Sequence, residues 1–400
     1  MCEPHLVLNR SLAVTKISIA SLLSPTSVGG LASYQQRLAE GLFATARHDV
    51  SLLALTEPSL ASPTVMNSGR MSIEMIPGRD SFESWMPVLR SLASRPHLLP
   101  VLRMLIHKLL SPAKLAARMQ NTQALHFVGT GWDFLGFSLM KAARTAGIRF
   151  TIWPAVHPKN WGDDQIDISL YSRADGIFCQ SDHERRHLEK LGVPVAKLLR
   201  CGLPPMCKTN GNGEQLRQSL DIAQRPAVLF LGRRDEGKGY PALLEAWPLV
   251  LRRCPNAVLL LAGPGDADQQ RLSHIPSVNV RDLGCPDEEQ KADAYAACNV
   301  FCLPSAHESF GIVYVEAWSY GKPVLCGTAP ASRELVEDGV TGVWADQQPQ
   351  QLASSLLWLL LDPEYSQRLG SAGLEHQRLK FTEERMLDSH LKAWGAASLN

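Results

Sequence analysis

The chain has 400 residues, enough for two or three domains, and its composition is that of a globular protein. Forty basic and 39 acidic residues give a formal net charge of +1, which provides no overall attraction to nucleic acid. The sequence shows no long apolar run, no signal-peptide pattern over its first twenty residues, and nine scattered cysteines without zinc-ligand spacing. We therefore expect a cytoplasmic protein with reduced thiols and no transmembrane helix.

Strands and helices alternate along the first half of the chain. A first strand is predicted at Lys16–Ala20, followed by a helix from Gly29-Gly30 through Phe43 and a second strand at Val50–Leu55. Further short apolar strands are predicted at Ala124–Val128, Ile148–Trp153 and Gly176–Cys179. This order of strand and helix predicts a mostly parallel sheet.

The alternation is interrupted by Pro204-Pro205 and the Gly/Asn-rich segment that follows, so we predict a linker near 204–213. It resumes with strands at Ala227–Leu231, Ala257–Ala262, Val300–Leu303 and Pro323–Cys326, and it ends with an amphipathic helix at Thr382–Trp394. The predicted fold is α/β, with two doubly wound Rossmann-like domains that face each other across a cleft. Their expected bounds are 1–204 and 205–380, and residues 381–400 form a C-terminal helix that packs back toward the first domain.

The segment from Pro304 to Glu316 suits a nucleotide carrying a sugar. Its helix is predicted to begin near Ile312, and the first amides of a helix have no internal partner and favour a phosphate. Gly311 removes the side chain where an anion would approach the backbone. From Gly311 to Glu316 a helix rises roughly 7.5 Å, about the reach from a diphosphate to its ribose. This segment could therefore hold a sugar at Glu308, a diphosphate at Phe310-Gly311 and a ribose at Glu316.

A second loop, Gly232–Tyr240, also follows a predicted strand and opens a helix. Arg233 and Lys238 would project from it, and two fixed cations can offset the charge on a departing nucleoside diphosphate without a metal ion. The alternative is a solvated basic loop whose charges are paired with Asp235 and Glu236.

These residues resemble the retaining GT-B glycosyltransferases of family 4, also called glycosyl transferases group 1. In the second half the resemblance rests on Gly232-Arg233 with Lys238-Gly239, Glu308-Ser309-Phe310-Gly311 with Glu316, Gly321-Lys322-Pro323-Val324, and Glu334-Leu335-Val336 followed by Asp338–Gly342. In the first half it rests on the weaker Gly29-Gly30, His48-Asp49-Val50 and His157.

The resemblance implies a metal-independent enzyme without a cofactor that moves a sugar, with retention of configuration, from a nucleotide-diphosphate donor to a hydroxyl of a saccharide or glycolipid. The first domain would take the acceptor and the second the nucleotide sugar. The implied catalytic residues are Glu308 and His157, and the implied donor-binding residues are Gly30, Arg233, Lys238, Ser309, Phe310, Gly311, Ile312 and Glu316.

The chain also departs from the family pattern. Ser309 stands where a glycine is usual, and Cys201-Gly202 replaces the usual Asn-Gly at the linker. Ala329-Pro330-Ala331 replaces a Gly-Gly pair often found before Glu334, which leaves the role of that loop open. Asp266-Ala267-Asp268 is a literal Asp-x-Asp, but after a tight turn its acidic residues predict a helix N-terminus rather than a metal site.

Segment 84–132 contains no acidic residue but has basic side chains among apolar ones: Arg90, Arg95, Arg103, Lys108, Lys114 and Arg118. This pattern favours a peripheral contact with an anionic membrane surface. Prolines at 96, 100 and 112 argue against one long membrane helix. The alternative is an ordinary basic helical face.

Other functions remain open on the sequence alone. A sugar-nucleotide epimerase or a phosphorylase can share the fold, and a non-catalytic nucleotide-sugar binder would keep the same pocket. His126, Trp132 and Asp133 follow a strand and could line the acceptor side or pack in the core. The base, donor sugar, acceptor and linkage are not determined by these patterns.

Overall fold

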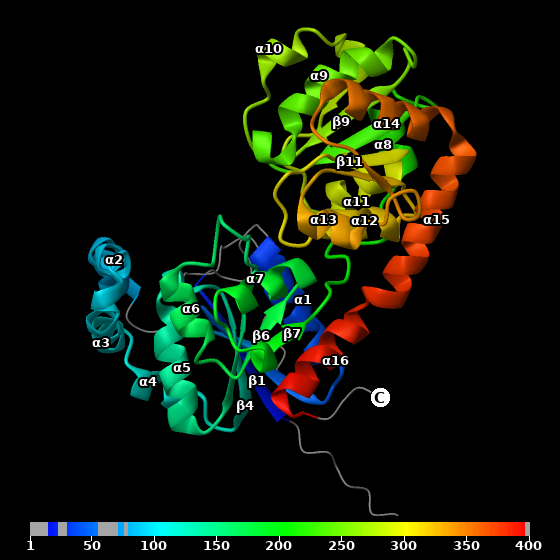
Figure 1. Cartoon of the computed structure of the whole chain (residues 1–400). Coiled ribbons are helices and arrows are strands. Elements are labelled where there is room, and N and C mark those ends of the chain that lie inside the picture. Colours follow the sequence, from blue (N-terminus) through cyan, green and yellow to red (C-terminus); the bar gives the residue numbers. More distant parts are fainter. Residues whose placement is uncertain (1–14, 23–29, 55–70, 76–78, 397–400) are drawn as a thin grey trace, which may run out of the picture. The chain divides into compact units, whose positions relative to one another are not determined.

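The computed structural model describes residues 15–22, 30–54, 71–75 and 79–396, shown as coloured ribbon in Figure 1. By its internal contacts the chain divides into two compact units. The first comprises Met1–Pro154, Asp164–Phe178 and Leu387–Asn400, and the second comprises Ala155–Asp163 and Cys179–Met386.

The first sheet has seven strands in the order β3-β2-β1-β4-β5-β6-β7, and the pairs from β3 to β6 are parallel. Its strands are β1 (Thr15–Ser21), β2 (His48–Ala54), β3 (Met71–Met75), β4 (Thr122–Val128), β5 (Arg149–Trp153), β6 (Gly176–Cys179) and β7 (Leu198–Arg200). The helices along this part of the chain are α1 (Gly30–Ala44), α2 (Arg79–Ala93), η1 (Pro96–Leu98), α3 (Leu99–Leu109), α4 (Pro112–Arg118), η2 (Gly131–Asp133), α5 (Leu135–Ala146), α6 (Gln165–Tyr171), α7 (Asp182–Lys190) and η3 (Val195–Lys197).

The second sheet has six parallel strands in the order β10-β9-β8-β11-β12-β13. Its strands are β8 (Ala227–Leu231), β9 (Val258–Ala262), β10 (Val280–Asp282), β11 (Val300–Leu303), β12 (Val324–Cys326) and β13 (Val343–Trp344). The helices that accompany and follow it are α8 (Gly213–Ser219), η4 (Glu236–Lys238), α9 (Tyr240–Leu251), α10 (Gln269–Leu272), η5 (Ser277–Asn279), α11 (Glu288–Ala297), α12 (Ile312–Ser319), α13 (Pro330–Leu335), α14 (Pro349–Leu361), α15 (Pro363–Lys380) and α16 (Glu383–Trp394).

Each sheet reverses its strand order once, and that reversal positions the site. In the first sheet the chain proceeds outward from β1 in both directions, and in the second it does so from β8. The loops that follow β8 and β11 therefore leave the same edge of the sheet side by side, which is the usual ligand position in doubly wound folds. The central strands are continuous apolar runs, since helices cover parallel sheets on both faces: every residue of β9 and β11 is buried.

The predicted pair of doubly wound parallel sheets is confirmed. The sequence did not reveal β3, β7, β10 and β13, which are the four strands at the sheet edges. Pro248 lies inside α9, and the helix continues past it to Leu251. The cleft expected between the two domains stays a prediction.

The end of the chain belongs to the first unit. The imidazole Nε2 of His390 in α16 lies 2.6 Å from the hydroxyl of Tyr34 in α1, and both residues are fully buried. The indole N–H of Trp394 donates to Thr151 Oγ1 at 2.8 Å. These contacts fix the last helix into the core made by β4, β5 and β6, so the first unit needs residues from both ends of the chain.

Candidate functional site

Two loops of the second unit, which we call the donor loops, meet after β8 and β11. They comprise residues 232–239 and 304–312. The fully buried Ser305 hydroxyl donates to the carbonyl of Gly237 at 3.1 Å, and the N–H of Ala306 donates to the same carbonyl at 2.8 Å. These bonds join the two loops without involving their charged side chains. The backbone that holds the charged side chains is therefore fixed by separate contacts.

The donor loops bring Lys238 and Glu308 into direct contact. The ammonium Nζ of Lys238 lies 2.6 Å from Glu308 Oε1 and also donates to the carbonyl of His307 at 3.3 Å. Their side chains are only 13% and 9% exposed, so water screens this ion pair far less than a surface pair. The lysine therefore holds the glutamate in one position, with its charge compensated.

The two arginines of the first donor loop have different partners. Arg233 has a side chain that is 67% exposed and donates to Asp235 at 2.8 Å. Burial alone would raise the pKa of Asp235, but the Arg233 guanidinium and the Lys238 N–H outweigh it and lower that pKa. Arg234, by contrast, is 4% exposed and forms a bidentate pair with Asp282 at the end of β10. Arg233 is thus the cation available to a ligand, and Arg234 is a structural one.

The second donor loop ends at the first turn of α12. Gly311 has φ +93°, and a Cβ placed there would lie 2.6 Å from the ring of Tyr314, so only glycine fits. Among the described residues no group accepts from the N–H of Gly311 or Ile312. Phe310, 2% exposed, packs edge-on against Phe381 with ring centroids 5.6 Å apart. The turn therefore presents backbone N–H donors at the positive end of a helix, a suitable position for a phosphate.

Glu316 lies on α12 and is 2% exposed. Its carboxylate accepts a hydrogen bond from the Tyr295 hydroxyl at 2.7 Å and lies 3.5 Å from Lys291 Nζ, both on α11. Burial and the nearby Glu316 charge raise the pKa of Tyr295 well above its usual value, so its proton is retained for this bond. A carboxylate has about four lone-pair sites, and these partners leave some of them for a hydroxylated ligand.

His157 is half-buried in the loop after β5, within the second unit. The backbone N–H of His157 donates to the carbonyl of Trp161, and the backbone carbonyl of His157 accepts from the backbone N–H groups of Asn160 and Trp161. Burial lowers its pKa; the Glu308 charge opposes this shift, and Lys238 and Arg233 reinforce it. His157 is therefore neutral at pH 7 and lies within electrostatic reach of the Lys238–Glu308 pair.

The remaining predicted donor-binding residues are Ile312, Ser309 and Gly30. Ile312 opens α12, and the carbonyl of Ser309 accepts from the Ser181 hydroxyl at 3.0 Å. Gly30 is the exposed first residue of α1, and a Cβ there would meet no atom within 4 Å. The residues that precede it, including Gly29, lie outside the described residues, so its role with the donor phosphates stays a prediction.

Sequence reasoning missed several residues that hold this site. Ser181 and Glu184 form bonds around the start of α7, and Glu334 binds the same turn, a contact that its motif did not predict. The only signal for Ser181 and Glu184 was the spacing Ser181-x-x-Glu184, which is typical of a helix N-terminus. The partners of Glu316 on α11 carried no signal at all.

On the first unit, His126 is a core residue. It is fully buried and hydrogen-bonds Tyr34 and Thr151, each at 2.9 Å. Trp132 is partly exposed and donates from its indole to Asp164 at 2.7 Å. Asp133 accepts from the N–H of Thr130, and burial raises its pKa to about 6. Of the three side chains that could line the acceptor side or pack in the core, His126 packs in the core.

The Asp266-Ala267-Asp268 segment is a helix N-terminus, as expected. The side chain of Asp268 accepts from the N–H of Arg271, and its second oxygen pairs with the guanidinium of the same residue at 2.6 Å. Within residues 15–22, 30–54, 71–75 and 79–396, no three His, Cys, Asp or Glu side chains are grouped as metal ligands.

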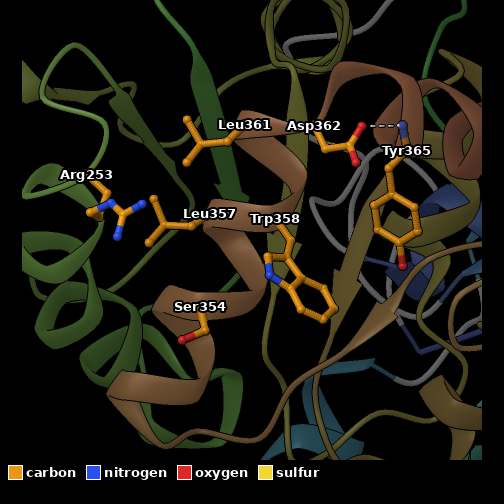
Figure 2. Close-up of a pocket in the computed structure, with 7 residues that line it drawn as sticks. All are labelled: Arg253, Ser354, Leu357, Trp358, Leu361, Asp362 and Tyr365. Carbon is orange, nitrogen blue, oxygen red and sulfur yellow. Dashed lines mark hydrogen bonds between the residues drawn. The ribbon is translucent and has the colours of Figure 1, made fainter.

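A separate pocket of about 580 Å³ lies where α14 joins α15, shown in Figure 2. None of its lining residues is a predicted site residue, and Trp358 on its wall is 68% exposed. The lining comprises Arg253, Ser354, Leu357, Trp358, Leu361, Asp362 and Tyr365.

Comparison with known proteins identifies similar sequences and folds. The model of the family described as glycosyl transferases group 1 matches residues 212–376, the stretch that carries both donor loops and α12. Over this stretch the chain is similar to the group 1 glycosyl transferases. The resemblance drawn from the motifs alone is therefore confirmed.

Two curated relatives are mannosyltransferases. The chain is 39% identical over 213 residues to the phosphatidyl-myo-inositol mannosyltransferase of Mycobacterium tuberculosis, a match covering 51% of this chain and 55% of that protein. It thus spans about half the length of that relative. It is 27% identical over 364 residues to the GDP-mannose-dependent alpha-(1-6)-phosphatidylinositol monomannoside mannosyltransferase of Mycolicibacterium smegmatis, covering 86% of this chain and 82% of that protein.

Solved structures share the fold. The Anabaena protein HepE, in complex with UDP-glucose, superimposes with a TM-score of 0.74 at 17% identity, covering 95% of this chain and 99% of that one. Sucrose-phosphate synthase from Thermosynechococcus elongatus gives a TM-score of 0.72 at 20% identity, covering 95% and 98%. At such identities the likeness concerns the fold, which is GT-B.

Proposed function

We propose that this protein is a retaining glycosyltransferase that moves a sugar from a nucleotide-diphosphate donor to a hydroxyl of a glycolipid. The observation that carries the proposal is the Lys238–Glu308 pair beside the open first turn of α12. A carboxylate for sugar hydroxyls, a cation and backbone N–H groups for a diphosphate are thereby placed on one fixed frame. The names of the two mannosyltransferases support GDP-mannose as the first donor to test and an inositol lipid as the acceptor class.

The proposed reaction uses these groups. The bond between the sugar C1 and the diphosphate oxygen breaks, and the departing diphosphate is stabilised by Lys238, Arg233 and the α12 amides. The acceptor oxygen attacks the same face of C1, and its proton passes to the departing phosphate oxygen. Glu308 stabilises the positive charge that develops on the sugar ring, and neutral His157 contacts the sugar as it moves. No metal or other cofactor takes part in this scheme.

We further propose that the acceptor is reached at a membrane surface, from the cytoplasmic side. Pro96, Pro100 and Pro112 lie in the first turns of η1, α3 and α4, so the chain from 96 to 118 forms short separate helices. Trp85, Val88, Val101 and Met104 on α2 and α3 are between 42% and 62% exposed, close in sequence to the exposed Arg90, Arg95 and Lys108. Exposed apolar and basic side chains together suit anionic lipid. Among the described residues, none of the helices is long and apolar enough to cross a bilayer.

A thermal-shift panel of UDP, GDP, ADP and their sugars tests the donor site, and product analysis with the best stabiliser and an inositol lipid tests the reaction. We expect one nucleoside diphosphate and its sugar to raise the melting temperature, and a glycosylated lipid with the donor's anomeric configuration. Stabilisation without any transfer would favour a non-catalytic binder. Conversion of the sugar nucleotide without an acceptor would favour an epimerase.

A further inference from the structure

The first turn of α7 contacts both loops that carry the proposed catalytic side chains. Ser181 is the N-cap of α7 and Glu184 lies one turn further on; they are 1% and 0% exposed. Both belong to the second unit, as do His157 and the donor loops. Ser181 and Glu184, which we call the α7 turn, form the contacts described next.

Glu184 is bonded to the loop of His157. Its Oε1 accepts from the N–H of Val156, the residue directly before His157, at 2.8 Å, and its Oε2 accepts from the N–H of Gln180 at 2.6 Å. A fully buried carboxylate is costly unless it is hydrogen-bonded, and here both oxygens have buried N–H donors. Burial raises the pKa of Glu184 to about 7, and the bonds from Gln180 and Val156 limit that rise.

The backbone beside this bond is strained. Ala155 has φ +50° and Lys159 has φ +68°, conformations that non-glycine residues rarely adopt. Such a conformation persists only where surrounding contacts impose it, and the Glu184–Val156 bond lies immediately next to Ala155. The carboxylate therefore fixes the direction in which the chain enters His157.

Ser181 is bonded to the other loop. Its hydroxyl donates to the carbonyl of Ser309, directly after Glu308, at 3.0 Å and accepts from the N–H of Glu184 at 3.1 Å. Glu334 on α13 holds the same turn from outside by accepting from the N–H of Asp182 and His183 at 2.6 and 2.7 Å.

From these contacts we infer that Glu184 and Ser181 are positioning residues, which set His157 relative to Glu308 through the backbone of Val156 and Ser309. Neither side chain needs to touch substrate. This inference rests on the proposed function, because sugar transfer is the reaction for which the two side chains are positioned.

The decisive variant is Glu184→Gln, which has nearly the same shape. Its side-chain amide keeps one acceptor oxygen but turns an NH₂ group toward one of the two N–H donors. We expect kcat to fall about 10- to 100-fold with the donor KM within about twofold of wild type, since a small displacement of a catalytic group costs rate more than binding. Glu189→Gln is the matched control, because Glu189 is an exposed glutamate on the same helix and should change neither value.

A double-mutant cycle separates positioning from general damage. In a His157→Ala background we expect Glu184→Gln to change kcat less than about twofold, because the group it positions is gone. An equal loss in both backgrounds would overturn the inference. Retained stabilisation by the nucleotide shows that each variant is folded.

A second variant covers the case in which Glu184→Gln does not fold. Ser181→Ala removes the bond to the Ser309 carbonyl and the cap of α7, whereas Ser181→Thr can keep both. We expect Ser181→Ala to lower kcat and Ser181→Thr to restore at least half of it; a threonine variant as slow as the alanine variant would contradict the role of the hydroxyl. If the wild-type chain transfers no sugar, the proposed function fails; if it does and these variants match it, only the positioning role fails.

Discussion

The donor loops and the α2–α4 segment both gather basic side chains, but they hold them in opposite ways. In the donor loops Lys238 is largely buried and paired with Glu308, and Arg234 is almost fully buried and paired with Asp282. In α2 and α3 the basic residues Arg90 and Lys108 are exposed beside exposed apolar side chains. Paired and shielded charges can recognise one ligand geometry, whereas exposed charges attract any anionic surface and lose strength with added salt.

The most damaging change should be Glu308→Gln. The neutral amide keeps the size of the side chain but removes the negative charge that faces the developing cation, so we expect kcat for sugar transfer to fall about 10²- to 10³-fold. Initial rates at saturating donor measure this. Glu337→Gln is the control, an exposed glutamate in the same unit, and transfer by Glu308→Gln near the wild-type rate would remove this residue from the mechanism.

Lys238→Ala should affect binding and rate together. Losing the ammonium removes a phosphate partner and leaves the poorly exposed Glu308 carboxylate without its cation. We expect kcat/KM to fall about 100-fold, with weaker nucleotide binding by calorimetry. If the unpaired Glu308 carboxylate destabilises the Lys238→Ala variant, adding Glu308→Gln should recover part of the melting temperature. Lys141→Ala on α5, an exposed lysine, should leave both quantities unchanged.

The buried Glu184 predicts an unusual pH dependence of stability. Its pKa is about 7 in the folded chain and 4.5 in the unfolded one, so between these values the folded state holds a proton that the unfolded state has released. The free energy of unfolding should therefore fall as pH rises through this window. Denaturant titrations at pH 5 and pH 8 should show wild type losing about 2.5 kcal/mol more than Glu184→Gln. An identical pH response of the two proteins would contradict the raised pKa.

The α2–α4 segment should yield the smallest effect. Reversing Arg90 and Lys108 to glutamate should weaken binding to anionic vesicles about 30-fold, since the loss of two basic residues at roughly 1 kcal/mol each is about 2 kcal/mol. Reversing the exposed Arg252 and Arg253 of the second unit changes the net charge equally and should leave vesicle binding intact. Equal binding of wild type to neutral and anionic vesicles would remove the membrane proposal.

The sequence predicts the central strands well because burial on both faces makes them apolar runs. The edge strands β10 and β13 have three and two residues and one partner each, so no such run marks them. The donor loops could be found because their glycines and charges lie within short segments. The contacts of the α7 turn could not be predicted, because they join Glu184 to a backbone N–H 28 positions away and Ser181 to a carbonyl 128 positions away.

The contacts of Tyr34 and Thr151 with His390 and Trp394 also bear on how the chain folds as it is made. When a ribosome has released the first 380 residues, the whole second sheet is present, yet the first unit still lacks the helix that completes its core. Domains generally form in order from the N-terminus during synthesis. Here the order of completion is reversed, and nascent chains cut short before residue 390 should leave the first unit open to proteases.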